Sequence, residues 1–150
     1  CKSANNSKKL RYLFNKLKKN LVLYLLELVS ELKQSKFNEH YMELSLSGDG
    51  AYAPKSLSFD VNDDVTVSLN GTADRVDVFR DNDTAYVKVI DYKSGTEKIS
   101  LDLIDKGYGA QLFIYLFTLC KMKDCDFKEK FMGNAKEIKP AGIMYFPMNI

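Results

Sequence analysis

One stretch of the chain, Val87-Lys-Val-Ile-Asp-Tyr-Lys-Ser-Gly95, decides the fold. Its first half is mostly apolar and β-branched, which is typical of a strand, and the Ser-Gly pair ends it. Side chains alternate along a strand, so Asp91 and Lys93 lie on the same face, where the apolar run ends and the rim of a sheet opens to solvent. The sequence therefore predicts a carboxylate and an ammonium side by side at a sheet rim.

The position of this acid-x-Lys triplet distinguishes it from three others in the chain. Only Asp91–Lys93 ends a hydrophobic strand, whereas the others begin at Glu31, Asp126 and Glu137, on a predicted helix or beside predicted loops. In a phosphodiesterase the carboxylate would hold a hard divalent cation such as Mg²⁺, and the lysine would orient or help to deprotonate the attacking water. The alternative is an exposed ion pair that contributes less than about 1 kcal/mol to stability.

A second acidic segment, Gly71-Thr-Ala-Asp-Arg-Val-Asp-Val78, reads as the preceding strand. Asp74 lies on its otherwise apolar face, where a carboxylate is costly unless it is paired or binds a metal. Residues 81–84 form a predicted hairpin turn, and this pairing brings Asp74 and Asp91 to the same end of the sheet. We therefore expect Asp74 to be the second metal ligand. For Asp77, on the opposite face, a salt bridge or a turn edge is the better interpretation.

The remaining hydrophobic pattern predicts a mixed α/β sheet flanked by helices. Apolar residues at spacings of three and four predict one long amphipathic helix, residues 6–36, that buries one stripe. The predicted strands that follow form an antiparallel meander, and a last, nearly apolar strand is expected at the centre of the sheet. The strands are 41–46, 56–61, 65–70, 73–80, 85–92 and finally 141–147, with a second helix over 106–121 before the last of them.

Two polar residues of the second predicted helix share a face. Gln111 and Tyr115 are four residues apart, which is about one helical turn. An amide and a phenol in this arrangement could both touch a phosphate or support Lys93. A core tyrosine with a glutamine at its margin is the alternative, and sequence leaves both open.

Composition excludes several classes of protein. The chain has 150 residues, 45% of them hydrophobic, which suits one domain, and 22 basic against 20 acidic residues give a net charge of only +2. Residues 1–20 nevertheless hold seven bases and no acid, a pattern typical of either a phosphate contact or a solvated helix face.

Three cysteines form no disulfide framework, and no export signal or membrane span is present. We expect a cytoplasmic protein without membrane contact, and a chain beginning with Cys1 to be cut from a longer polypeptide.

Taken in order, four motifs resemble the RecB-type nucleases of the PD-(D/E)xK superfamily, and among these most of all the AddB-type nuclease domain. The resemblance covers residues 37–147, and each motif alone is weak whereas the ordered set is specific. The motifs are Gly71-x-x-Asp-Arg-Val-Asp77, Val89-Ile-Asp-Tyr-Lys-Ser-Gly95, Gly109-x-Gln-Leu-x-x-Tyr-Leu116 and Pro140-Ala-Gly-x-x-Tyr-Phe146.

This resemblance implies a restriction-endonuclease-like core, residues 37–150, after a leading helix, residues 1–36, in a single nuclease domain of a larger chain. It implies DNA cleavage with Mg²⁺ or Mn²⁺, exonucleolytic and directed at single strands delivered by the helicase subunit of an AddAB- or RecBCD-like complex in double-strand break repair. The alternative is a catalytically silent nucleic-acid-binding or scaffolding module with the same fold.

The resemblance also implies roles for individual residues. The metal ligands would be Asp74, Asp91 and the main-chain carbonyl of Tyr92, and Lys93 would be the catalytic lysine. The supporting positions would be Gln111 and Tyr115 on the helix motif and Glu43 before the core strands.

The chain departs from the family pattern at two places. Many relatives have a metal-binding histidine upstream, but His40, the only histidine, stands three residues before Glu43 and is not expected to correspond. AddB-type domains also hold an iron–sulfur cluster between flanking cysteines, whereas Cys120 and Cys125 lie inside the core segment, so no cluster is expected in this fragment.

Overall fold

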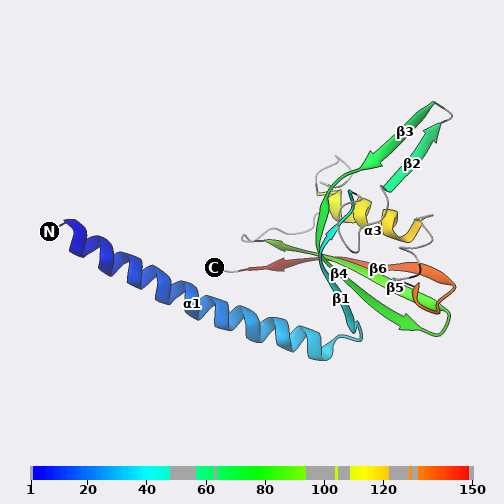
Figure 1. Cartoon of the computed structure of the whole chain (residues 1–150). Coiled ribbons are helices and arrows are strands. Elements are labelled where there is room, and N and C mark those ends of the chain that lie inside the picture. The colour runs from blue at the N-terminus through cyan, green and yellow to red at the C-terminus, as the bar shows by residue number, and fades with distance from the viewer. Residues whose placement is uncertain are drawn as a thin grey trace.

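A computed structural model of the chain describes residues 2–47, 57–62, 64–93, 104, 109–121, 129 and 132–148. Figure 1 shows a sheet with one short helix above it and a long helix that runs out from its lower side. The helices are α1 (Lys2–Gln34) and α3 (Gln111–Lys121), and the strands are β1 (Glu39–Ser45), β2 (Leu57–Asn62), β3 (Val65–Leu69), β4 (Thr72–Asp81), β5 (Thr84–Lys93) and β6 (Glu137–Pro147).

The main sheet has four strands in the order β1-β4-β5-β6, so the predicted mixed α/β sheet with a long N-terminal helix is confirmed. Strands β1, β4 and β5 pair antiparallel, and β6 pairs parallel with β5. The predicted continuous meander is wrong, because β2 and β3 form a separate two-stranded sheet and β1 takes the place beside β4. Val65 and Val67 of that hairpin stay exposed, whereas Leu44 of β1 is buried against the core. Burial therefore favours β1 over β3 as the partner of β4.

The core lies between one face of this sheet and α3. Four valines of β4 and β5, at positions 76, 78, 87 and 89, are fully buried on that face. Helix α3 covers them with Leu112, Tyr115, Leu116 and Leu119, which recur at the three- and four-residue spacing of one helix face. Alternation along β4 and β5 thus leaves the neighbouring positions, including Arg75 and Asp77, on the opposite face.

Strand β6 corrects a second expectation. It pairs only with β5 among the described strands and so lies at an edge of the four-stranded sheet rather than at its centre. Its apolar sequence has another cause: Ile143 and Tyr145 pack against the core, and Phe146 contacts the aromatic ring of Tyr24 from α1. A strand covered on both faces reads as an apolar run whether or not it has two neighbours.

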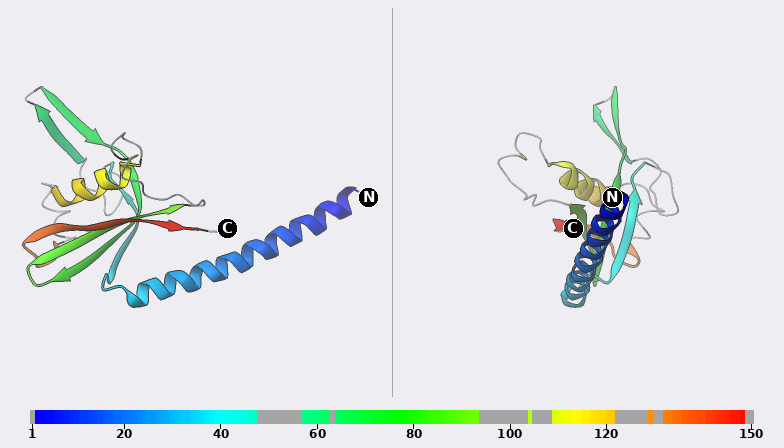
Figure 2. Two further views of the ribbon diagram at one scale, coloured as in Figure 1. Left: turned by 180° about the vertical axis from the view of Figure 1, so that it is seen from behind. Right: turned by 90° about the vertical axis from the view of Figure 1, so that its left-hand side faces the viewer.

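Helix α1 confirms the predicted element, but most of its apolar stripe is not buried. A helix of 33 residues is about 50 Å long, which exceeds the width of the sheet. Only its C-terminal part meets the sheet, where the Tyr24 ring lies 6.3 Å from that of Tyr92 and 5.5 Å from that of Phe146. Figure 2 shows the rest extending past the sheet. Among the described residues, no helix combines the length and apolarity needed to cross a membrane.

Candidate active site

The candidate site lies where β4 begins and β5 ends, and the predicted residues come together at this edge of the sheet. Arg75 of β4 and Ile90 of β5 are the last residues paired between these strands, and Asp74 and Asp91 directly adjoin this pair. Asp91 in turn pairs with Tyr145 of β6. Residues opposite one another on neighbouring strands project to the same face, which here is the face that carries the core and α3.

A main-chain hydrogen bond fixes the first carboxylate of this site. The N–H of Tyr92 donates to Asp74 Oδ2 over 2.9 Å, which holds the side chain of Asp74 against the backbone residue that follows Asp91. One carboxylate oxygen of Asp74 is thereby committed to the sheet. Its other oxygen keeps its acceptor capacity for a ligand.

The second carboxylate is paired with the predicted lysine. Lys93 Nζ lies 2.9 Å from Asp91 Oδ2, and the same ammonium sits 5.7 Å above the ring of Tyr145. Asp91 Oδ2 is buried and makes no hydrogen bond of good geometry with any residue that the structure describes, so the contact with Lys93 is an ion pair. A buried carboxylate is costly unless it is paired, so the Lys93 ammonium stabilises Asp91 here, and a bound metal cation would act in the same way.

The donor chemistry of this corner fits a hard divalent cation. Carboxylate and main-chain carbonyl oxygens are the ligands that Mg²⁺ prefers, and Asp74, Asp91 and the Tyr92 carbonyl would supply such oxygens. The structure does not add Glu43 to this set: in the described part of the chain, no group of three His, Cys, Asp or Glu side chains is arranged to hold a metal. Glu43 is exposed and has a φ of 49° within β1, where the pairing with β4 passes from Met42–Arg75 to Leu44–Ala73 and leaves Glu43 out.

Gln111 and Tyr115 are brought together as the helical spacing predicted. Gln111 Nε2 donates a hydrogen bond of 2.7 Å to the Tyr115 hydroxyl, and Tyr115 itself is buried in the core while Gln111 is exposed. The hydroxyl also lies so close to Gly71 that a Cβ there would overlap it. Glycine is therefore required at the start of the Gly71–Asp77 motif by packing against α3.

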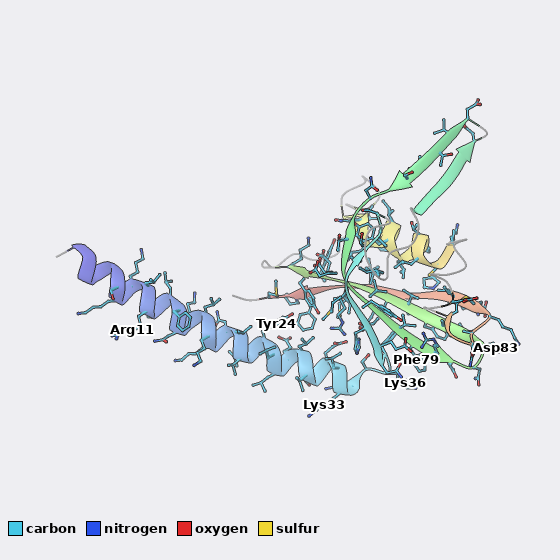
Figure 3. The ribbon with its side chains drawn as sticks, in the orientation of Figure 1. Arg11, Tyr24, Lys33, Lys36, Phe79 and Asp83 are labelled. Atoms are coloured by element: carbon cyan, nitrogen blue, oxygen red, sulfur yellow. The ribbon has the colours of Figure 1, made fainter. Side chains whose placement is uncertain are left out.

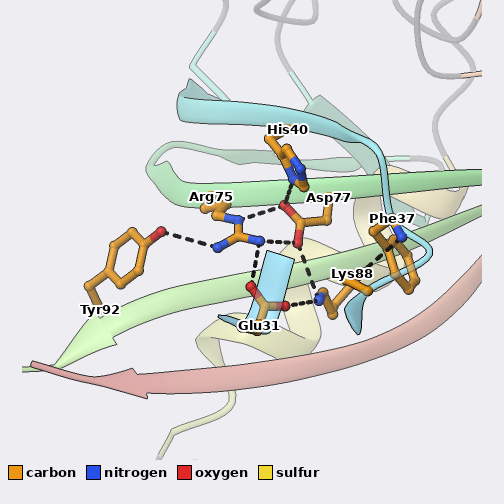
Figure 4. Close-up of polar contacts among 8 residues, drawn as sticks. Glu31, Phe37, His40, Arg75, Asp77, Lys88 and Tyr92 are labelled. Carbon is orange, nitrogen blue, oxygen red and sulfur yellow. Dashed lines mark hydrogen bonds and ion pairs between the residues drawn. The ribbon is translucent and has the colours of Figure 1, made fainter. Parts of the chain in front are cut away.

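On the opposite face of β4, Asp77 forms the salt bridge that the sequence predicted. Arg75 Nε donates to Asp77 Oδ1 and Arg75 Nη2 to Asp77 Oδ2, each over 2.6 Å, and both side chains are fully buried (Figure 4). The turn-edge alternative is wrong, because Asp77 pairs with Lys88 in the middle of the sheet. Burial alone would raise the pKa of Asp77, but hydrogen bonds with Arg75 and His40 hold that pKa below its ordinary value.

This ion pair belongs to a larger cluster that ties α1 to the sheet (Figure 4). Glu31 of α1 accepts hydrogen bonds of 3.1 Å from both Arg75 Nη2 and Lys88 Nζ. Lys88 Nζ also lies 3.2 Å from Asp77 Oδ2, and His40 Nδ1 lies 2.7 Å from Asp77 Oδ1. Arg75 Nη1 reaches the Tyr92 hydroxyl at 3.5 Å, so the cluster borders the strand segment that carries the candidate ligands.

Sequence reasoning missed the members of this charged cluster other than Arg75 and Asp77. A signal was present for Glu31, which occupies a position on the apolar stripe of α1 between Leu28 and Leu32. A charge on a stripe that faces a sheet needs a partner across the interface. The identity of that partner depends on contacts between residues 44 positions apart, which no local pattern encodes.

Comparison with known proteins shows the family of the chain. The family model described as "PD-(D/E)XK nuclease superfamily" matches residues 2–149, so the chain belongs to this superfamily. It is also similar to proteins named as the B-type subunits of an ATP-dependent helicase/deoxyribonuclease. That of Clostridium kluyveri is 33% identical over 144 residues, 96% of this chain and 12% of the relative. That of Clostridioides difficile is 33% identical over 146 residues, 97% of this chain and 12% of the relative. The predicted AddB-type resemblance is confirmed, and the chain spans 12% of the length of these relatives.

Proposed function

We propose that this chain is the metal-dependent nuclease module of a helicase–nuclease and that it hydrolyses DNA phosphodiester bonds. The observation that carries the proposal is the corner at Asp91, where a buried carboxylate oxygen forms an ion pair of 2.9 Å with the Lys93 ammonium. Asp74, held by the Tyr92 N–H, lies beside it. Two carboxylates and one ammonium at a strand end suit phosphodiester hydrolysis because each has a role in it.

The carboxylates and the Tyr92 carbonyl would hold Mg²⁺ or Mn²⁺. When bound, such an ion supplies positive charge that stabilises the charge developing on the phosphate. For Glu43 we keep the proposal of a supporting role, although in the described part of the chain its carboxylate does not form a group of three with the other two.

Lys93 would orient the attacking water and help to remove its proton, and its charge would offset the negative charge that builds on the phosphate. The Asp91 carboxylate holds the ammonium at the site in the meantime. Gln111 would touch DNA, and its exposure together with the hydrogen bond between its amide and the Tyr115 hydroxyl supports this role. Tyr115 would act as a positioning residue through this hydrogen bond.

The finer features of the function are part of the same proposal. The names of the relatives join a helicase to a deoxyribonuclease, so we propose that a helicase subunit delivers single DNA strands to this module during double-strand break repair. We further propose exonucleolytic cleavage, a cytoplasmic location and a single domain, with residues 1–36 as its leading helix and residues 37–150 as its catalytic core, inside a longer polypeptide.

The proposal is tested with end-labelled single-stranded DNA and Mg²⁺ or Mn²⁺. We expect cleavage that chelation stops and that Asp91→Asn and Lys93→Gln each reduce by at least about 100-fold. Asp64→Asn is the matched control, because it removes an exposed carboxylate in the β2–β3 turn. Circular DNA without ends separates exonuclease from endonuclease action.

The non-catalytic alternative makes the opposite prediction. The basic N-terminal end of α1 favours it, since seven basic and no acidic side chains occur in residues 1–20. It predicts DNA binding that is independent of metal and yields no products. Calorimetric titration with Mn²⁺ decides the case of a silent assay: a site lost in Asp74→Ala supports the nuclease proposal, whereas no binding to the wild type contradicts it.

A further inference from the structure

The N-terminal half of α1 presents a stripe of large apolar side chains to solvent. These residues recur at three- and four-residue spacings and so lie on one face of the helix. Each is between 47% and 70% exposed, far more than is usual for a run of large apolar residues on one helix face. The apolar stripe consists of Leu10, Leu13, Phe14, Leu17 and Leu21.

The apolar stripe continues a surface that is already in use at the other end of the helix. One and two turns beyond Leu21 the same face carries Tyr24 and Leu28, and here it lies on the sheet, with the Tyr24 ring 5.5 Å from that of Phe146. The contact ends because the helix passes the edge of the sheet. The same helix face therefore packs on protein at one end and has no described partner at the other.

The helix is held in its direction by polar contacts at its base. Glu31 accepts hydrogen bonds from Arg75 of β4 and Lys88 of β5, both over 3.1 Å. Figure 3 shows the side chains of the N-terminal half, among them Arg11, projecting around a helix that stands clear of the sheet. Two anchors, the ion pairs and the Tyr24 contact, thus fix where the apolar stripe points.

The charges beside the apolar stripe identify the kind of surface that would cover it. Residues 2–26 contain no acid, and at 100° per residue Lys9 and Lys16 flank one side of the stripe while Lys18 and Arg11 flank the other. A second copy of the helix would bring these bases against bases. A DNA backbone would satisfy the bases and leave the stripe in water. An apolar groove with carboxylates along its rims satisfies both features at once.

We propose that the apolar stripe of α1 docks into such an acid-rimmed apolar groove on the remaining polypeptide of the helicase/nuclease subunit. This inference rests on the proposed function, in which the chain is a module of a longer protein. The relatives supply room for the groove, because the chain matches only 12% of their length. Since α1 is anchored on β4 and β5, docking would place the candidate active site in a fixed position relative to the rest of that protein.

Thiol labelling at two positions tests the docking. The chain replaces the matching 144 residues of the Clostridium kluyveri relative, its own cysteines are changed to serine or alanine, and one new cysteine is introduced as Leu17→Cys or Lys19→Cys. Lys19 lies on the helix face opposite Leu17 and serves as the matched control. We expect Leu17→Cys to react at least about ten-fold more slowly in the whole protein than in the chain alone, with Lys19→Cys unchanged.

Equal rates of Leu17→Cys in both proteins would overturn the proposal. Slow labelling of the chain alone would also overturn it if the rate depended on the concentration of the chain, on added DNA or on added anionic vesicles. In these cases the stripe would be covered by a second copy, by DNA or by a membrane surface. Should the chimera not fold, the chain is mixed with the C. kluyveri relative lacking the matching segment, and protection of Leu17→Cys is measured in trans. Lys16→Glu combined with Lys18→Glu should remove the protection, and retained protection contradicts the acidic rim.

These readouts do not depend on cleavage. A chain that is docked but cuts no DNA would support this inference and contradict the nuclease proposal. If the protein cleaves DNA while Leu17→Cys reacts at its full rate in the whole protein, the nuclease proposal is supported and the docking inference is contradicted.

Discussion

The backbone N–H of Tyr92 donates a 2.9 Å hydrogen bond to Asp74 Oδ2, which ties a side chain of β4 to the main chain of β5 at the strand end. Since Tyr92 directly follows Asp91, the bond sets the spacing of the two candidate metal ligands. Asp74 thereby serves the sheet and the site at once. The two roles can be separated by substitutions that keep either the acceptor or the charge.

Asp74→Asn and Asp74→Ala should differ in stability but not in metal affinity. The asparagine keeps an acceptor for the Tyr92 N–H, so its free energy of unfolding in urea should stay within about 0.5 kcal/mol of the wild type. The alanine leaves that N–H without its partner and should lose about 1–3 kcal/mol. Both variants should weaken Mn²⁺ binding in calorimetry. Equal stability of the two would show that the hydrogen bond contributes nothing, and wild-type Mn²⁺ affinity would remove Asp74 from the ligand set.

Gly71→Ala should destabilise the chain, because the added methyl group overlaps the Tyr115 hydroxyl. We expect a loss of about 1–3 kcal/mol in the free energy of unfolding. Gly142→Ala is the control, since a Cβ there meets no atom within 4 Å. Combining Gly71→Ala with Tyr115→Phe removes the overlapping oxygen, so the double variant should lose less than the sum of the single losses. Strict additivity would contradict the proposed contact.

The strands of the candidate site could be predicted because their signals are local. Alternation marks β4 and β5, and the turn between them sets an antiparallel register in which Asp74 and Asp91 directly adjoin the last pair. The partners of β1 and β6 could not be predicted in the same way. β1 pairs with β4 although the β2–β3 hairpin lies between them in the chain, and the residues paired in parallel between β5 and β6 are 53 or 54 positions apart. No pattern within either strand specifies such a neighbour.

Burial was the other property that sequence could not assign. The apolar face of α1 was predicted to be buried along its length, yet only the part near Tyr24 contacts the sheet. For Asp77 the sequence predicted a salt bridge or a turn edge but not its full burial, which occurs where Arg75, His40 and Lys88 converge on it. In both cases the outcome depends on which distant surface comes opposite the residue, and local periodicity holds no such information.

Glu31→Gln tests whether the base of α1 is anchored by charge. Glu31 accepts from Arg75 and Lys88, and the glutamine can accept only through its single carbonyl oxygen and without charge. The free energy of unfolding should fall by about 1–3 kcal/mol. Glu27→Gln, at an exposed position one turn earlier, should change it by less than about 0.5 kcal/mol. Similar small effects of both substitutions would mean that the Tyr24 contact alone holds the helix.

Asp77→Asn should have the largest effect, because it removes the buried carboxylate that holds the Arg75 guanidinium at two nitrogens and leaves Glu31, 3.1 Å away, as the remaining charged partner among the described residues. We expect the free energy of unfolding near pH 7 to fall by about 3–5 kcal/mol. The exposed variant Asp64→Asn controls for the loss of one negative charge and should change stability by less than about 0.5 kcal/mol. A small effect at Asp77 would show that the attraction of its carboxylate for Arg75, His40 and Lys88 is cancelled by the repulsion of His40 and Lys88 from Arg75.

The same variant fixes the sign of the pH dependence. The pKa of Asp77 is lower in the folded chain than its ordinary value of 3.8, so between these two values the unfolded chain binds the extra proton. The stabilisation is therefore complete above about pH 3.8 and is lost as the pH falls through the folded value. In urea titrations the difference between wild type and Asp77→Asn should shrink as the pH falls below that point. A difference that instead grew on acidification would mean that the folded chain takes up the proton first, and the Arg75 pairing would not be what lowers the pKa of Asp77.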